Sequence, residues 1–294
     1  MSYLKLSITT KPDQAEQLSE LLIELGAISV SFQDAEDEPI FQITPGETPL
    51  WQHTKVEGLF EENVAIETII KALKAHDTYL THSDFYIEKI EDQDWVRITQ
   101  QQFHPQQYGK NLWICPAWDN ASDLPGTIVK IDPGLAFGTG THPTTALCLE
   151  WLADNPPKEK SVIDYGCGSG ILSLAALALG AAMVWAVDHD KQAIIATKNN
   201  AKLNDFYNPE RLIISLPEDC SAHKADIVIA NILANPLIEL APTLIHFTKP
   251  KSLLILSGIL ENEIDRVAAA YENKLTRIDT KLANEWARLV FLNT

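Results

Sequence analysis

Apolar and polar residues follow two different patterns along the chain, and the change of pattern divides it into two blocks. In the first block, residues 1–92, residues 3–10 alternate apolar and polar as a half-buried strand does. Residues 12–26 instead repeat leucines three or four positions apart and end at Gly26, which predicts an amphipathic helix. The pattern continues as strand, strand, helix and strand over residues 27–34, 55–60, 63–76 and 85–92. The order βαββαβ is typical of a small α+β ferredoxin-like domain.

From residue 131 onward, apolar strands alternate with helices, which predicts a mostly parallel, doubly wound sheet in an α/β domain, residues 131–294. The longest apolar run, residues 171–187, approaches the length of a membrane span. It contains Ser173 and Gly180, and polar segments flank it. We therefore expect a buried helix followed by a buried strand. Residues 93–130 are expected to form a connector helix and lead-in strands.

Charge is unevenly distributed between the blocks. Residues 1–92 hold 18 Asp and Glu against 6 Lys and no Arg, a net charge of −12 of the chain's −17. We expect no sequence-specific binding of nucleic acid, because phosphate binding needs clustered Lys and Arg. A basic protein partner would be attracted to this surface. The alternative is that the acidic surface serves only solubility.

The cysteines and the N-terminal residues indicate the cellular compartment in which the protein is expected. The cysteines show no paired spacing, which indicates reduced thiols and argues against zinc or another metal. They are Cys115, Cys148, Cys167 and Cys220. The first residues have no basic segment and no apolar core, so we predict no signal peptide. We expect a cytoplasmic monomer that does not enter a membrane.

A glycine turn follows the first predicted strand of the second block. Asp164 begins the pattern D-x-G-x-G-x-G, in which Gly166 and Gly168 let the backbone approach a ligand closely. A dinucleotide fingerprint, G-x-G-x-x-G, would need a third glycine where Ile171 stands. This spacing disfavours a nicotinamide oxidoreductase.

Polar residues end two later strands. Asp188 ends the second predicted strand of this sheet, where an acid can accept hydrogen bonds from both ribose hydroxyls. Asn231 ends the fourth. Asp164 is expected to bond loop amides in a supporting role. A capping role for Asp188 is the alternative to ribose binding.

A second glycine-rich stretch, DPGLAFGTGTHPTT, spans residues 132–145 and runs into a predicted helix. Such loops often hold phosphates, but no lysine follows the last glycine, so the nucleoside-triphosphate signature is missing. Thr141 or His142 can cap the helix, with Pro143 in its first turn. The alternative reading is a hinge between domains.

Together these motifs resemble the Rossmann-like S-adenosylmethionine-dependent methyltransferases. The stretch FGTGTHPTT, placed before the first Rossmann strand and behind a ferredoxin-like domain, resembles one family among them. These are the bacterial methyltransferases that modify the large-subunit ribosomal protein L11. EDQDW, FHP, LWICPAW and VIANILANPL extend the resemblance over essentially the whole chain.

The resemblance implies S-adenosylmethionine as cofactor and a basic ribosomal protein as substrate. It implies that residues 1–92 recognise this substrate and that lysine ε-amines and the N-terminal α-amine are methylated, several times over. Phe137 would pack on the cofactor, while the hydroxyls of Thr144 and Thr145 would meet its methionine carboxylate at the helix N-terminus. The complete set expected to bind the cofactor is Phe137, Thr144, Thr145, Gly166, Gly168, Asp188 and Asn231.

The residues after Asn231 bear on the acceptor. Enzymes that methylate glutamine or base amines typically carry Asn-Pro-Pro-aromatic here, whereas this chain has Ile-Leu-Ala. Asn235-Pro236 is expected to cap a helix. We predict that Asn231 orients an aliphatic amine through its carbonyl oxygen. The alternatives are a glutamine or nucleic-acid methyltransferase, and a cofactor-binding ribosome-assembly protein without catalysis.

Overall fold

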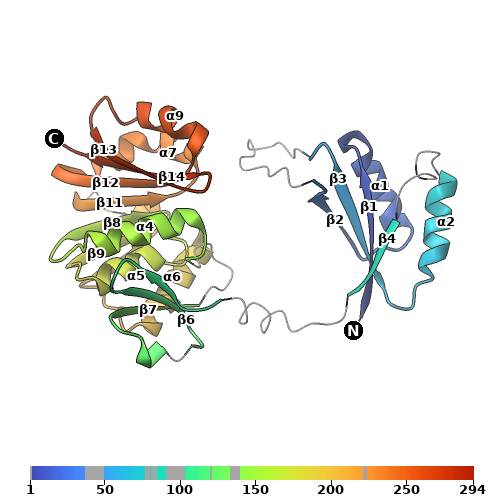
Figure 1. Ribbon diagram of the computed structural model, residues 1–294, viewed down its shortest axis with the longest axis horizontal. Coiled ribbons are helices and arrows are strands. Elements are labelled where there is room, and N and C mark those ends of the chain that lie inside the picture. Colours follow the sequence, from blue (N-terminus) through green and yellow to red (C-terminus); the bar gives the residue numbers. More distant parts are fainter. Residues whose placement is uncertain are drawn as a thin grey trace. The chain divides into compact units, whose positions relative to one another are not determined.

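The computed structural model of the chain divides into two compact units, residues 1–98 and 99–294 (Figure 1). It describes residues 2–36, 50–76, 80, 85–90, 103–119, 121–132, 140–220 and 224–294. The connector helix is predicted within residues 93–130, and the first part of that range, residues 93–102, lies outside this described part. The lead-in strands lie in the second unit.

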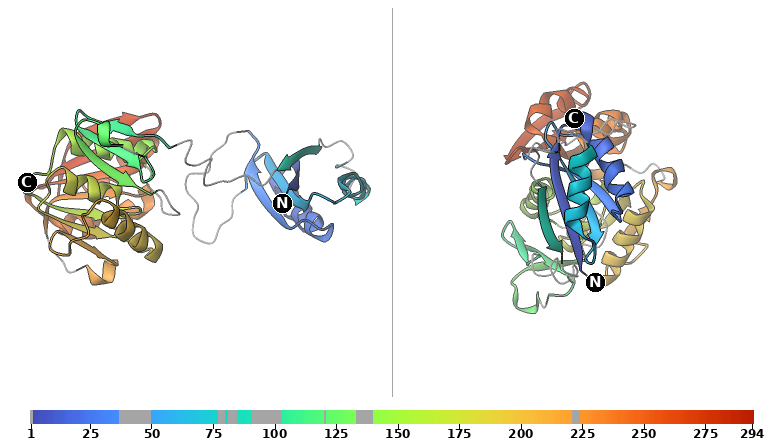
Figure 2. Two further views of the ribbon diagram at one scale, coloured as in Figure 1. Left: turned by 90° about the horizontal axis from the view of Figure 1, so that it is seen from below. Right: turned by 90° about the vertical axis from the view of Figure 1, so that its right-hand side faces the viewer.

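The first unit has the predicted element order βαββαβ. Its elements are β1 (Tyr3–Thr10), α1 (Pro12–Glu24), β2 (Ser29–Asp34), β3 (Thr54–Glu61), α2 (Ile66–His76) and β4 (Phe85–Ile90). The four strands form an antiparallel sheet in the order β2-β3-β1-β4 (Figure 1). Figure 2 shows the structure from two further sides. The helix α1 ends at a left-handed glycine, Gly26 with φ +96°, as its sequence predicts.

One apolar core holds the first unit together. Alternate residues of β1 and β3 share one face of the sheet and pack with residues from both helices. Examples are Leu6 and Ile8 of β1 with Leu22 of α1 and Leu73 of α2, all fully buried. Both helices therefore cover the same face of the sheet.

The second unit contains a small sheet and a large one. The small sheet, in the order β5-β6-β7, consists of β5 (Gln106–Tyr108), β6 (Leu112–Pro116) and β7 (Thr127–Ile131). The large sheet comprises β8 (Ser161–Tyr165), β9 (Met183–Val187), β10 (Leu212–Ser215), β11 (Ala225–Asn231), β12 (Thr248–Leu260), β13 (Thr276–Ala283) and β14 (Trp286–Leu292). Its strand order is β10-β9-β8-β11-β12-β14-β13. The first five strands of this order are parallel and β14 is antiparallel to both neighbours, which confirms the mostly parallel sheet.

Helices cover both faces of the large sheet (Figure 1). They are α4 (Pro143–Asp154), α5 (Ile171–Ala178), α6 (Lys191–Leu203), α7 (Ala234–Glu239), α8 (Ala241–His246) and α9 (Ile264–Ala269). One apolar core joins the sheet to α4, α5 and α6, and a second joins it to α7, α8 and α9. Adjacent residues of β8, Val162 and Ile163, belong to different cores, as expected for a strand buried on both faces.

The apolar run 171–187 resolves into α5 and β9, with Gly180 at φ +101° in the turn between them. The prediction of a buried helix followed by a buried strand is confirmed. No helix in the described ranges is long and apolar enough to cross a membrane.

A polar cluster joins the beginnings of three neighbouring strands, β8, β11 and β12. The Asp226 carboxylate accepts hydrogen bonds from the backbone amide and the hydroxyl of Ser161, at 2.9 and 2.6 Å. Lys249 Nζ lies 2.9 Å from its other oxygen. Partial burial raises the pKa of Asp226, but these donors outweigh it and lower the pKa to about 2.

This lowered pKa predicts how Asp226 contributes to stability as pH changes. The folded-state pKa of about 2 lies below the unfolded value near 3.9, so the contribution is complete above about pH 5 and is lost as pH falls toward 2. In urea unfolding, Asp226→Asn should be less stable than the wild type at pH 6. The gap should shrink steadily down to pH 3. A gap independent of pH would contradict this account.

Candidate functional site

The strand order places a topological switch point between β8 and β11, where a ligand-binding crevice is expected. The chain leaves β8 toward β9 on one side and returns to β11 on the other, and ligands bind at the carboxyl ends of the strands at such a switch point. Gly166 follows β8, and Asn231 is the last residue of β11. Two of the predicted site residues therefore stand on the two sides of this switch point.

The glycine turn brings the two strand ends into close approach. Gly166 has φ +85°, and a Cβ atom placed there would lie 2.4 Å from Cγ2 of Ile232, the residue after β11. Gly170 has φ +81°, and its Cβ would lie 2.8 Å from Cγ2 of Thr197 on α6. Glycine is required at both positions for backbone conformation and for space.

Hydrogen bonds from neighbouring elements hold the backbone of this turn. The amide of Gly166 donates to the Val187 carbonyl at 2.7 Å, and the amide of Gly168 donates to Asp188 Oδ2 at 2.9 Å. The Thr197 hydroxyl donates to the Gly168 carbonyl at 3.0 Å. The predicted residues Gly166, Gly168 and Asp188 are thus brought together.

Asp188 is buried, with 8% of its surface exposed. Besides the Gly168 amide on Oδ2, its Oδ1 accepts from the backbone amide of Asp190 at 3.0 Å, and Asp190 in turn caps α6. A carboxylate has about four acceptor positions. Asp188 therefore keeps the capacity to accept further hydrogen bonds.

Asp164 lies beneath the turn, at the end of β8. Its Oδ2 accepts from the amide and the hydroxyl of Ser173 in α5, at 3.0 and 2.7 Å. Its Oδ1 is buried and has no hydrogen-bond partner among the described residues. Burial raises the pKa of Asp164 to about 6, although the Ser173 bonds oppose the rise. Its described partner is thus a residue inside α5, and not the loop amides that we predicted.

The second glycine-rich stretch is described only in part. Residues 133–139, which include Phe137, lie outside the described ranges. His142 is the N-cap of α4, where its Nδ1 accepts from the Thr144 amide at 3.4 Å, and Pro143 begins the helix. The rings of His142 and Trp286 pack edge to face, with their centroids 5.1 Å apart. Burial lowers the pKa of His142. The predicted cap by His142 is confirmed.

The two threonines that follow are buried in the first turn of α4. The Thr144 carbonyl accepts from the Ser257 hydroxyl of β12 at 3.0 Å, and its own hydroxyl lies 2.8 Å from His142 Nδ1. The Thr145 hydroxyl accepts from Asn231 Nδ2 at 3.1 Å. This bond joins the start of α4 to the end of β11.

The hydrogen bond that Asn231 donates to Thr145 fixes the side chain of Asn231. Its nitrogen is directed to Thr145, whereas its Oδ1 is buried without a hydrogen-bond partner in the described part of the chain.

The prediction that Asn235 caps a helix is wrong. Leu233 is the N-cap of α7, so Asn235 lies inside the helix, and its Oδ1 accepts from Arg266 Nη1 at 2.8 Å. Pro236 indicates only that a first helical turn lies here, because proline is tolerated at more than one position of that turn. It therefore does not determine which residue is the N-cap.

Three residues that support this site were missed in the sequence. Thr197 and Asn200 of α6 donate hydrogen bonds to carbonyls of the glycine turn. Tyr108 of β5 lies with its hydroxyl 2.8 Å from the Gly140 carbonyl, and burial raises its pKa to about 12, so the hydroxyl remains a donor. For α6 a signal existed, because polar residues that disfavour helices recur on one face.

Comparison with known proteins now decides the family. Residues 2–294 match the family described as ribosomal protein L11 methyltransferase (PrmA). The chain belongs to this family. The resemblance drawn from the sequence motifs is confirmed.

Relatives of the same name cover nearly all of this L11 methyltransferase family member. The ribosomal protein L11 methyltransferase of Pasteurella multocida (strain Pm70) is 47% identical over 290 residues, 98% of both chains. That of Haemophilus influenzae (strain PittEE) is 46% identical over 289 residues, again 98% of both chains. A solved structure, a ribosomal protein L11 methylase from Lactobacillus delbrueckii subsp. bulgaricus, has a TM-score of 0.59 and 32% identity. It covers 64% of this chain and 98% of its own.

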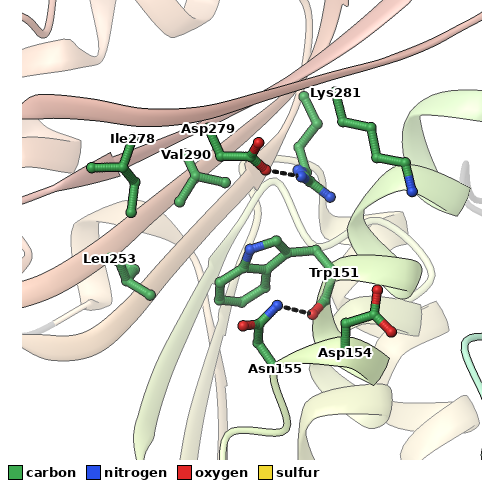
Figure 3. Close-up of a pocket in the computed structure, with 9 residues that line it drawn as sticks. Trp151, Asp154, Asn155, Leu253, Ile278, Asp279, Lys281 and Val290 are labelled. Atoms are coloured by element: carbon green, nitrogen blue, oxygen red, sulfur yellow. Dashed lines mark hydrogen bonds and ion pairs between the residues drawn. The ribbon is translucent and has the colours of Figure 1, made fainter.

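A pocket of about 320 Å³ lies away from these residues, at the opposite end of α4 (Figure 3). Trp151 and Asn155 line it from the helix side, and Asp279, paired with Arg288, lines it from β13 and β14. Along α4, Trp151 lies about 9 Å beyond Thr145, and Asp154 lies about 15 Å beyond Thr144. In this L11 methyltransferase family member the pocket is thus distinct from the switch point.

The close approach at Gly166 gives a test with an internal control. Gly166→Ala should destabilise the protein by at least about 1 kcal/mol more than Gly180→Ala, measured by urea unfolding. Both substitutions force a left-handed alanine, but a Cβ at Gly180 would meet nothing nearer than 3.4 Å. Adding Ile232→Ala should recover part of the difference. Equal losses in the two single variants would show that the 2.4 Å approach has no energetic consequence.

Proposed function

We propose that this chain transfers methyl groups to lysine ε-amines and the N-terminal α-amine of ribosomal protein L11. Its family is that of the ribosomal protein L11 methyltransferases, and S-adenosylmethionine is the methyl donor. The activity toward L11 follows from the family. The choice of amines is our proposal and is supported by the site described above.

The crevice expected between β8 and β11 suits this cofactor. Gly168 carries no side chain, so a ligand could approach its backbone closely, whereas the space at Gly166 is taken by the Ile232 side chain. Asp188 would accept the ribose hydroxyls. The first turn of α4, with Thr144 and Thr145, would favour the methionine carboxylate because backbone amides and the positive end of the helix dipole lie there. From the sequence we also assign Phe137 to the cofactor.

The Oδ1 of Asn231, which has no hydrogen-bond partner among the described residues, is the observation that supports amine transfer most directly. A buried acceptor without a donor is unfavourable by about 1–3 kcal/mol, so this oxygen would gain from an N–H group of a ligand. A neutral amine offers such a group and keeps its lone pair for the methyl carbon. Thr145 holds the other end of the carboxamide, so the direction of the oxygen is fixed.

The amine must first lose its proton. At pH 7 deprotonation costs about 4–5 kcal/mol for a lysine of pKa 10.4 and about 1 kcal/mol for an α-amine near 8. The positive sulfonium of the cofactor lowers the amine pKa further, and water can accept the proton. The remaining rate enhancement comes from holding the amine in line with the methyl–sulfur bond.

Two other functions are less well supported. A glutamine or nucleic-acid methyltransferase would be expected to carry Asn-Pro-Pro-aromatic at the end of β11, where this chain has Ile232 and Leu233. A ribosome-assembly protein without catalysis would have no need for the Thr145 bond that directs Asn231. We also keep the predictions of a cytoplasmic monomer.

The acidic first block, residues 1–92, is proposed to recognise the basic substrate. With methyl-labelled S-adenosylmethionine, the full chain should label ribosomal protein L11 in total ribosomal protein, and rising salt should slow association. Residues 93–294 alone should bind cofactor but transfer poorly. Label on RNA, or on no protein, would reject the proposed function. Full activity of the shortened chain would reject only the role of the first block.

Turnover and cofactor affinity, measured separately, distinguish the two possible roles of Asn231. Asn231→Ala should lower turnover by about 100-fold or more with little change in cofactor affinity, because positioning of the amine is lost. Asn235→Ala is the matched control, since its carboxamide bonds to Arg266 and should leave turnover unchanged. For the wild type, the rate should rise from pH 7 to pH 9 as more amine is deprotonated. Weakened cofactor binding with normal turnover would instead make Asn231 a cofactor ligand only.

A further inference from the structure

Thr197, in the middle of α6, contacts the glycine turn that follows β8. It is fully buried, and its hydroxyl donates to the Gly168 carbonyl at 3.0 Å, across 29 positions of sequence. Its methyl group packs at the end of the turn, because a Cβ placed on Gly170 would lie 2.8 Å from Thr197 Cγ2. A threonine hydroxyl inside a helix often bonds a carbonyl of its own helix. Here the hydroxyl proton holds a different segment instead.

The Thr197 hydroxyl makes a second contact with the turn, at Cys167. The Cys167 Sγ lies 3.4 Å from Thr197 Oγ1. A hydroxyl has one proton, and that of Thr197 goes to Gly168, so the thiol is the donor in this second contact. Burial raises the pKa of the Cys167 thiol well above its usual value, so the thiol keeps this proton. Thr197 therefore bonds two successive residues of the turn, one as donor and one as acceptor.

Gly168 is held on both sides of its Cα atom. Its amide donates to Asp188 Oδ2 at 2.9 Å, and its carbonyl accepts from Thr197. Its φ of +54° lies in the left-handed region, and glycine has more backbone freedom than any other residue. The two hydrogen bonds therefore restrict a residue that has no side chain of its own to restrict it.

The helix α6 reaches the Asp188 carboxylate by two routes. Asp190 is the N-cap of α6, and its backbone amide donates to Asp188 Oδ1 at 3.0 Å. Thr197 lies seven residues further along, which is about two turns and places it on nearly the same side of the helix. It acts on Asp188 Oδ2 through Gly168. Each oxygen of the carboxylate is thus oriented by one of these two routes.

We propose that Thr197 is a positioning residue for cofactor binding, because it fixes Gly168, whose amide orients the Asp188 carboxylate. The inference rests on the proposed assignment of Asp188 to the ribose of S-adenosylmethionine. Without the Thr197 hydroxyl, Gly168 regains backbone freedom, and its amide no longer holds Oδ2 in one direction. The ribose hydroxyls then meet a less well oriented acceptor, which weakens binding. Thr197 itself need not touch the cofactor.

Two substitutions separate the hydroxyl of Thr197 from its methyl group. Thr197→Val keeps the shape and removes the hydroxyl, and by calorimetric titration it should raise Kd for S-adenosylmethionine roughly 5- to 20-fold. Turnover at saturating cofactor should be unchanged. Thr197→Ser keeps the hydroxyl and leaves a methyl-sized cavity, so it should lower the melting temperature but raise Kd by less than about twofold. A wild-type Kd for Thr197→Val, or equal Kd values for the two variants, would overturn the proposal.

Thr248→Val is the matched control for loss of a buried threonine hydroxyl. Thr248 is 1% exposed and donates to the Ile245 carbonyl at 2.7 Å. It is the first residue of β12, so it lies at the opposite edge of the sheet from the strand ends that carry Asp188 and Asn231. Thr248→Val should lower the melting temperature and leave Kd within about twofold of the wild type. A rise in Kd as large as that of Thr197→Val would show a general effect of lost stability and would overturn the positioning role.

A double-mutant cycle with Asp188→Ala tests the route through the carboxylate. Asp188→Ala should itself raise Kd at least about tenfold. Adding Thr197→Val to it should change Kd by less than about twofold, because the group that Thr197 orients is gone. Fully additive effects would overturn the route through Asp188. If Asp188→Ala binds normally, the proposed cofactor site is wrong. If Asp188→Ala is impaired and Thr197→Val is not, the site stands and only the positioning role is rejected.

Discussion

The structure around the strand ends of β8 and β11 depends on providing hydrogen-bond partners for the backbone amides and carbonyls of one glycine turn. A turn that lets a ligand reach its main chain cannot use its own side chains to pair its buried amides and carbonyls, yet such groups are costly when unpaired. Here the partners come from outside the turn. The Val187 carbonyl and Asp188 accept from its amides, while Thr197 and Asn200 donate to its carbonyls. The conformation of the turn therefore requires β9 and α6 to be in place.

The same contacts connect stability to the proposed chemistry. Asp188 is held by the Gly168 amide, which fixes where its free acceptor positions point. Ile232 fills the space above Gly166, and its backbone also packs on Gly258 of β12, where a Cβ would lie 2.3 Å from the Ile232 carbonyl oxygen. Ile232, the residue after β11, therefore packs against two glycines. This leaves Asn231, the last residue of β11, little conformational freedom. The Thr145 bond then sets the direction of its carboxamide.

Local periodicity explains which features the sequence predicted. The leucine spacing of α1 and the apolar strand of β9 depend on residues close together in the chain, and both elements were found as expected. Asp188 and Asn231 were placed at strand ends because a parallel sheet gathers such ends at one edge. The Asn200 and Thr145 contacts could not be predicted, since they join residues 31 and 86 positions apart. Thr197 and Asn200 share one face of α6, but their spacing does not show which backbone groups they bond.

The choice of a carboxamide at position 231 has a physical reason in the reaction we propose. A carboxylate there would stabilise the ammonium form of the incoming amine, which has no lone pair and cannot attack. A neutral oxygen can bind an N–H group of the free amine without favouring its protonation to the same degree. Recruitment of a basic substrate makes the opposite demand, because negative charge attracts the protonated lysines. In our proposal, the net charge of −12 in residues 1–92 would meet that demand in a different part of the chain from Asn231. The sequence would thus separate attraction of the cation from the chemistry of the neutral amine.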